Sequence, residues 1–292
     1  MTTIRVATRG SAQARTQAQV VADQLGAQGI EAELVLIETL GDRTQAGNVP
    51  LHTIGGQGVF TKEVQRAVLD GRAEIAVHSA KDLPSGDAPG LEIGAFVERR
   101  SVADVLIGST LERLAHGAPV ATGSVRRRAQ LRRVRPDLEF RELRGNIPTR
   151  LERIPDGGAI VMALAALEVL GLTERVAQLL DPVEFVPAVG QGCVAVECRT
   201  GDAVTLDALG MIDHAATRRA VTIERAFLAE LGAGCTMPVG AYVLGGTLHV
   251  FLAGDADDRV FSEAVSLSGD LDDDVRVSRT TARRAHDSVA AE

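Results

Sequence analysis

Hydrophobic and polar positions alternate along most of the chain in a strand, loop, helix order. Residues 4–8 form a short apolar run that predicts a buried strand, and residues 12–25 follow with helical spacing. The same order recurs, with strands expected at residues 33–39 and 75–78 and a helix at residues 59–69. This alternation predicts βαβ units, in which helices cover a mostly parallel sheet.

A second set of elements in the same order begins near Asp104. Its expected strands are residues 105–107, 120–122, 139–143 and 159–163, and its expected helices are residues 125–135, 149–153 and 165–170. These elements predict a second α/β lobe of similar build. Residues 194–199 are again strand-like and suit a return to the first sheet, which would make the first lobe discontinuous.

The pattern changes after His214. A long helix is expected at residues 215–231, followed by strands at residues 242–244, 247–253 and 260–267 and by a helix within residues 272–292. Turn residues stand between these strands, at Gly245 with Gly246 and at Asp257 with Asp258. We therefore expect an α/β protein of two lobes with a small α+β C-terminal domain that contains an antiparallel sheet.

Composition narrows the class of protein. No apolar run in the 292 residues reaches the ~18 needed to cross a bilayer, and the first residues lack the apolar core of a signal peptide, so a cytoplasmic protein is expected. Three cysteines, an odd number, argue against a disulfide framework. Cys193 and Cys198 have no nearby His or Cys, which favours buried hydrophobes over a zinc site, and no metal is expected.

The charge is unevenly distributed. The formal net charge is −8, yet the segment from Arg126 to Arg153 contains ten arginines and only four acidic residues. This basic island suits an anionic small ligand, or a local nucleic-acid contact through the helix of residues 126–135. The overall charge and the low aromatic content of 3% disfavour nucleic acid.

Polar loops follow several of the expected strands. They comprise residues 9–11, 79–82, 122–124 and 144–146. In α/β sheets, ligands bind at the carboxyl ends of strands, where backbone N–H groups and helix N-termini are exposed. Two lobes that each offer such groups describe a site for a polyanionic molecule.

Each of these features also has a purely structural explanation. Residues 122–124, which end in Ser124, suit a helix cap, and Asp82 suits the start of a turn before Leu83 and Pro84. His78 suits a buried core histidine better than a catalytic base. Residues 55–58 lack the Lys-Ser/Thr of a phosphate loop and predict a mobile flap. Cys235 is either a buried structural thiol or, with glycines beside it, a thiol in an accessible loop.

Taken together, the motifs resemble the porphobilinogen deaminase (hydroxymethylbilane synthase) family. The matching stretches, in the family's order, are residues 6–11, 55–60, 76–84, 122–127, 143–146, 187–192, 197–199 and 234–235. The resemblance implies two lobes similar to type II periplasmic binding proteins and a small α+β domain. The domains would be residues 1–98 with 193–212, residues 99–192, and residues 213–292.

The resemblance also implies an activity. Members are transferases that condense four porphobilinogen molecules head to tail, with loss of ammonia, onto a covalent dipyrromethane primer. The product is the linear tetrapyrrole hydroxymethylbilane of porphyrin and haem biosynthesis. Dipyrromethane is the implied cofactor, porphobilinogen the implied substrate, and a monomer without nucleic-acid or membrane partners is expected. The alternative is a catalytically impaired relative that acts as a two-lobed anionic-ligand-binding protein.

Roles of single residues follow from the same resemblance. Asp82 matches the catalytic carboxylate and Cys235 matches the thioether attachment of the primer. Cofactor- and substrate-binding positions are matched by Arg9, Ser11, Lys81, Thr122, Ser124, Arg126, Arg127, Arg144, Gly145, Arg150 and Gln191, and the mobile flap by Gly55, Gly56, Gln57, Gly58 and Phe60. The chain departs from the pattern where Thr53 and Gln57 replace lysines and where Val169 replaces an arginine, which removes one carboxylate partner.

Overall fold

The structure is a computed structural model that describes residues 3–39, 61–86, 88–232, 237–254 and 259–290. The chain forms two compact units. The first comprises Met1–Arg100 with Gly192–Arg218, and the second comprises Ser101–Gln191 with Arg219–Glu292. The division into three domains expected from the sequence stays a prediction.

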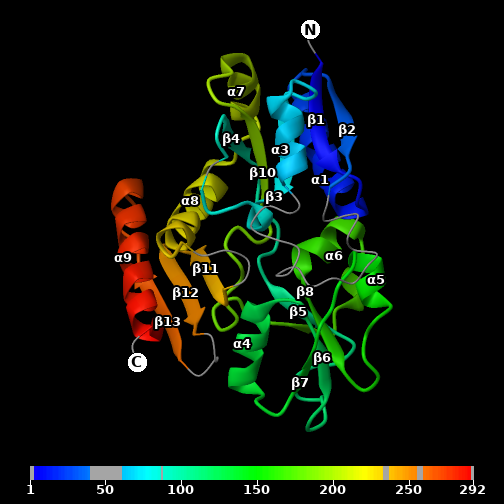
Figure 1. The fold of residues 1–292 in the computed structure, drawn as a ribbon, viewed down its shortest axis with the longest axis vertical. Coiled ribbons are helices and arrows are strands. Elements are labelled where there is room, and N and C mark those ends of the chain that lie inside the picture. Colours follow the sequence, from blue (N-terminus) through cyan, green and yellow to red (C-terminus); the bar gives the residue numbers. More distant parts are fainter. Residues whose placement is uncertain (1–2, 40–60, 87, 233–236, 255–258, 291–292) are drawn as a thin grey trace. The chain divides into compact units, whose positions relative to one another are not determined.

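The first unit is built on a five-stranded sheet of order β2-β1-β3-β10-β4 (Figure 1). Its elements are β1 (Ile4–Arg9), α1 (Ala12–Ala27), β2 (Ala32–Ile37), α3 (Lys62–Leu69), β3 (Ile75–Ser79), the 3₁₀ turn η2 (Ala80–Asp82), β4 (Leu91–Phe96), β10 (Val194–Arg199) and α7 (Ala203–Gly210). β1 pairs in parallel with β2 and β3, whereas β10 pairs antiparallel with β3 and β4. The sheet is therefore mixed rather than mostly parallel, and β10 returns to it as expected.

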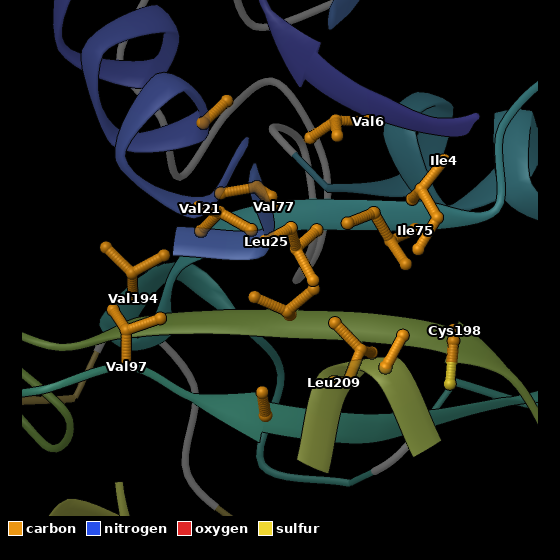
Figure 2. Close-up of a cluster of buried hydrophobic side chains, with 14 residues drawn as sticks. Ile4, Val6, Val21, Leu25, Ile75, Val77, Val97, Val194, Cys198 and Leu209 are labelled. Atoms are coloured by element: carbon orange, nitrogen blue, oxygen red, sulfur yellow. The ribbon is translucent and has the colours of Figure 1, made fainter. Parts of the chain in front are cut away.

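Helices cover both faces of this sheet because its strands alternate between two apolar sets. Figure 2 shows one set, in which Val6, Ile75 and Val77 meet Leu25 of α1 and Leu209 of α7. The intervening alanines of β1 and β3 face the other way and pack with α3. A side chain such as Leu25, which is fully buried, contributes about 1.5–3 kcal/mol by leaving water.

The second unit contains a five-stranded sheet of order β7-β6-β8-β5-β9. Its elements are β5 (Asp104–Ile107), β6 (Pro119–Ala121), α4 (Val125–Val134), β7 (Glu139–Arg141), α5 (Ile147–Leu151), β8 (Ala159–Ala163), α6 (Leu164–Leu170), η3 (Thr173–Arg175) and β9 (Gln178–Leu179). β6 pairs in parallel with β7 and β8, whereas β5 runs antiparallel to β8 and β9. Because β5 is antiparallel to β8, its first residue, Asp104, lies beside Ala163 at the end of β8.

The same unit holds a three-stranded antiparallel sheet and two long helices. The elements are α8 (Ala215–Glu230), whose first residues belong to the first unit, β11 (Val239–Leu244), β12 (Thr247–Ala253), β13 (Val260–Ser266) and α9 (Leu271–Ala290). One face of the sheet packs against Phe227 of α8 and Ala282 of α9. The other face presents Phe251 to Ala129 of α4, so α4 is held between two sheets of this unit.

Local pattern predicted most elements but missed three and displaced several ends, among them both ends of α5, which spans Ile147–Leu151 rather than 149–153. β4, β9 and α7 were not expected, β11 begins at Val239 rather than at 242, and β7 ends at Arg141 rather than at 143. The chain leaves the sheet after Arg141, and Gly145 has a φ of 112° that favours glycine. The turn at Gly245 and Gly246 has the positive φ values expected of a tight hairpin, whereas Asp257 and Asp258 lie outside the described residues.

Candidate functional site

Asp82 lies at the carboxyl edge of the first unit's sheet. It closes η2, directly after β3, and is half-buried. Because β1 and β3 run in parallel register, the segment that follows β1 reaches the same edge, and Ser11 stands there as the N-cap of α1. The Oγ atom of Ser11 accepts a hydrogen bond from the N–H of Ala14 at 3.3 Å. Arg9 and Lys81 are half-buried on the same two segments, so the four predicted residues of this unit share one edge.

A buried polar group lies within this sheet, on β3 and β10. His78 is 5% exposed, and its Nε2 atom lies 3.0 Å from Oε2 of Glu197 without the alignment of a hydrogen bond. Gln65 of α3 donates to both carboxylate oxygens of Glu197, at 3.1 and 2.9 Å. His78 is therefore a core histidine that contacts a buried acid. Neither Gln65 nor Glu197 was among the predicted site residues, although residues 197–199 form one of the stretches that match the family.

The second unit assembles its polar loops at one edge of its sheet as well. β6, β7 and β8 are parallel, so the loops of residues 122–124 and 142–146 emerge side by side. β5 runs the opposite way, and its first residue, Asp104, therefore lies opposite Ala163 at the same edge. Ser124 caps α4 and accepts from the N–H of Arg127 at 3.4 Å, as its helix-cap interpretation predicted.

Asp104 holds the two arginines of the first turn of α4. Nη2 of Arg126 and Nη2 of Arg127 each donate to a different oxygen of Asp104 at 2.7 Å. Their Nη1 atoms donate to the carbonyls of Val186, at 2.7 Å, and Val161, at 3.1 Å. Both arginines are buried, so they do not form part of a solvated charged face.

The electrostatics of this group follow from its burial. Burial by itself would raise the pKa of Asp104, but Arg126 and Arg127 outweigh it and hold that pKa well below its usual range. Burial lowers the pKa of Arg126 more than the attraction of Asp104 raises it, although a guanidinium stays charged at any ordinary pH. One carboxylate and two guanidiniums leave a net positive charge here, which favours an anion nearby.

Gln191 belongs to the same buried group. Its Nε2 atom donates to Oδ1 of Asp104 at 2.8 Å and to the carbonyl of Val102 at 2.7 Å. The neighbouring N–H of Gly190 donates to Glu224 of α8 at 3.0 Å. Three predicted binding residues, Arg126, Arg127 and Gln191, thus converge on Asp104, which the sequence reasoning missed. The available signal was an acidic residue at the head of a buried strand.

The remaining predicted residues of this unit surround the loop after β7. Nε of Arg150 donates to the carbonyl of Gly145 at 2.7 Å, and Asn146 caps α5. Arg144 is 13% exposed in its side chain, and its Nη2 lies 3.0 Å from Oε1 of Glu142. Among the described residues, the buried Nε atoms of Arg144, Arg127 and Arg128 have no hydrogen-bond acceptor. Thr122, 1% exposed, accepts from the N–H of Ser124 at 3.2 Å.

Chemically, this edge is suited to carboxylates. Buried guanidinium donors that lack an acceptor are costly, and a carboxylate satisfies them with two parallel hydrogen bonds. The N-terminus of α4 adds a favourable dipole at the same place. In the described part of the chain, no group of three or more His, Cys, Asp and Glu side chains is arranged to hold a metal ion, and no helix combines the length and apolar character of a membrane span.

Comparisons with known proteins identify the family. A family model described as "Porphobilinogen deaminase, dipyromethane cofactor binding domain" matches residues 4–207, and one described as "Porphobilinogen deaminase, C-terminal domain" matches residues 218–249. The chain belongs to the porphobilinogen deaminase family. A porphobilinogen deaminase of Mycobacterium marinum is 47% identical over 271 residues, covering 91% of this chain and 83% of its own length. One of Mycolicibacterium paratuberculosis is 45% identical, covering 99% of this chain and 93% of its own length.

Solved structures of periplasmic binding proteins are among the structural neighbours of this porphobilinogen deaminase family member. The methionine-binding protein MetQ aligns with a TM-score of 0.45 and 13% identity over 83% of this chain and 99% of its own. A periplasmic substrate-binding protein of an ABC transporter from Coxiella burnetii aligns with a TM-score of 0.41 and 14% identity over 74% of this chain and 94% of its own. The element order and sheet topology of this chain itself confirm the expected α/β class and the small antiparallel C-terminal sheet.

The residues present fit the cofactor that the family model names. The acceptor-free Nε atoms of Arg127, Arg128 and Arg144 are donors of the kind that the carboxylates of a dipyrromethane require. Cys235 and the flap residues Gly55, Gly56, Gln57, Gly58 and Phe60 lie outside the described residues. Cys193 and Cys198 are buried, as expected, and burial raises the pKa of Cys198 to about 11.

Proposed function

We propose that this chain is a hydroxymethylbilane synthase, which joins four porphobilinogen molecules head to tail on a primer and releases hydroxymethylbilane. The observation that carries the proposal is the family match over residues 4–207, which includes Asp82 and the carboxylate-binding edge around Arg144. None of the comparisons favours the alternative of a catalytically impaired binding protein. Substrate identity, a monomeric state and a cytoplasmic location are parts of the same proposal.

The arginines bind and orient the substrate and the growing product. Each porphobilinogen ring carries two carboxylates, so a growing chain accumulates negative charge that guanidinium forks neutralise bidentately. Arg144 and Arg128 offer buried donors for this purpose. Arg126 and Arg127 are fixed by Asp104, so their contribution is a preorganised positive charge and, at Arg127, the remaining Nε donor. Binding in this way makes each addition effectively unimolecular.

The carboxylate of Asp82 is the catalytic group of this proposal. In each addition the C–N bond of the substrate aminomethyl group breaks and ammonia leaves, while a carbon–carbon bond forms to the terminal pyrrole, which then loses its ring proton. The carboxylate of Asp82 stabilises the positive charge that develops on the substrate and relays the proton between the pyrrole and the leaving amine. When bound, dipyrromethane supplies the terminal pyrrole carbon for the first addition. One aspartate serves every cycle provided that the chain moves past it.

Attachment of the primer to Cys235 is part of this proposal. Two facts support it. Cys193 is 2% exposed and Cys198 is fully buried, so neither thiol is accessible to a pyrrole. The raised pKa of Cys198, about 11, also keeps it protonated and a poor nucleophile at neutral pH.

Intact-protein mass spectrometry of the purified chain tests the proposal. We expect a mass excess of one dipyrromethane in the wild type and in Cys198→Ala, and none in Cys235→Ala. Ehrlich's reagent should colour the first two proteins only. Porphobilinogen consumption with one ammonia released per molecule should accompany the adduct. An unmodified wild-type chain, or one that binds porphobilinogen without consuming it, would refute the proposal.

A further inference from the structure

Glu142 is an acidic side chain placed within the arginine cluster of the second unit. It follows β7 directly, and β7 lies beside β6, so Glu142 reaches the loop before α4. A Cβ atom added to Gly123 would lie 3.0 Å from Oε1 of Glu142, which shows how closely the carboxylate approaches that loop. The carboxylate therefore lies between two elements assigned to ligand binding.

The two oxygens of Glu142 engage two different arginines. Oε1 lies 3.0 Å from Nη2 of Arg144, and Oε2 lies 3.4 Å from Nη2 of Arg128. The Nε atoms of both arginines are buried and, among the described residues, without an acceptor. Glu142 thus contacts the Nη2 atom of each guanidinium and leaves the Nε atom without an acceptor in the described part of the chain. A ligand carboxylate that bound Nε and Nη2 together would make the better bidentate contact.

The exposed fractions of the three side chains indicate that Glu142, and not an arginine, moves away when these ion pairs break. The side chain of Glu142 is 45% exposed, whereas those of Arg144 and Arg128 are 13% and 29% exposed. An exposed carboxylate gives up a surface ion pair at small cost because water solvates it well. Two carboxylates at one guanidinium edge repel each other, so arrival of a ligand carboxylate favours departure of Glu142.

We propose that Glu142 is a competing carboxylate, which holds Arg128 and Arg144 until a carboxylate of the pyrrole chain takes its place, and which thereby limits how tightly each ligand carboxylate is held. The proposal rests on the proposed function. A product that grows past a single aspartate must release and rebind its carboxylates at every addition. A side chain that returns to the arginines lowers the cost of each release.

Isothermal titration calorimetry with citrate, a tricarboxylate, tests the competition without any reaction. Citrate should bind Glu142→Gln holoenzyme about two- to fivefold more tightly than wild type, the range expected for loss of an exposed competing ion pair. Glu139→Gln is the matched control. Glu139 lies three residues before Glu142, its side chain is 68% exposed, and its carboxylate is 4.0 Å from Arg141. The control variant therefore removes the same charge and should leave citrate affinity unchanged. Glu142→Ala is a second variant that also removes the carboxylate.

Further variants separate competition from simple charge removal. In an Arg128→Gln and Arg144→Gln double-variant background, adding Glu142→Gln should give no gain in citrate affinity, because both contested guanidiniums are gone. The KM for porphobilinogen should fall with Glu142→Gln and not with Glu139→Gln. An unchanged or weakened citrate affinity in Glu142→Gln and Glu142→Ala, or an equal gain in Glu139→Gln, would overturn the proposal. Wild type that makes no adduct and consumes no porphobilinogen would instead refute the proposed function, while the citrate comparison still decides the competition.

Discussion

The Oδ2 atom of Asp104 lies 2.7 Å from Nη2 of Arg126, and both side chains are almost wholly buried. The pair joins the first residue of β5 to the first turn of α4, and Arg127 completes it from the other carboxylate oxygen. A buried ion pair is costly to break because the remaining charge loses its partner in a medium of low polarity. The group therefore sets the position from which α4 presents its N-terminus.

Asp104→Asn should lower the free energy of unfolding by about 3–5 kcal/mol, because two buried guanidiniums lose their anionic partner while the side-chain volume hardly changes. Urea unfolding followed by circular dichroism measures the loss. Asp273→Asn is the control, since Asp273 is 49% exposed and pairs with Arg276 on the surface. Equal losses in the two variants would contradict a special role for the buried group.

The contribution of Asp104 should also depend on pH in one direction. Its folded-state pKa is lowered, so its stabilisation is fully present above the unfolded-state pKa, about 4, and is lost as pH falls through the folded-state value. The difference in unfolding free energy between wild type and Asp104→Asn should stay constant from about pH 8 to pH 5 and shrink only below about pH 4. A difference that already shrinks between pH 8 and pH 6 would assign the effect to another group.

Asp82→Asn should keep the fold and the primer while turnover of porphobilinogen falls about 10²- to 10⁴-fold, the usual contribution of a proton-transferring side chain. Steady-state kinetics measures turnover, and intact mass verifies that the primer is attached. Asp70→Asn is a matched control, because Asp70 pairs with Arg66 on the surface of α3. Near-normal turnover of Asp82→Asn would remove that carboxylate from the mechanism.

Cys198 should resist alkylation in the folded protein. With a pKa of about 11, only about one thiol in a thousand is ionised at pH 8, and the side chain is fully buried. Iodoacetamide followed by peptide mass spectrometry should find Cys198 unmodified under native conditions and modified in urea. Native labelling as fast as that of an unhindered cysteine would show that burial does not protect this position.

Gly123→Ala should destabilise the second unit and weaken carboxylate binding. The new Cβ would lie 2.9 Å from the carbonyl oxygen of Leu143, so the two loops at the ligand-binding edge must separate. Overpacking of this kind costs about 1–3 kcal/mol. Gly210→Ala is a fair control, because nothing lies within 4 Å of its added Cβ and it stands at the end of α7, outside the predicted binding loops. Thermal unfolding and citrate titration measure both effects, and equal behaviour of the two variants would contradict the steric argument.

The amino-acid sequence alone determined what is local. The apolar run that became β1, the cap at Ser124, the helix α4 and the polar loops at strand ends all follow from spacing and propensity within a few residues. The motif that contains Asp82, residues 76–84, was likewise recognised from the sequence alone. Local pattern missed β4, which contains Gly94, β9, which is only two residues long, and α7, whose eight residues make about two helical turns.

Only the tertiary structure decided which distant residues meet. Asp104 reaches Arg126, 22 residues away, because β5 runs antiparallel to β8 and so begins at the edge where α4 starts. Glu142 lies between Arg128 and Arg144 because β7 pairs with β6. Strand order and direction depend on how whole sheets bury their apolar faces, and no spacing along the chain encodes them. That burial fixes Arg126 and Arg127 on Asp104, whereas their direct binding of a ligand stays a prediction.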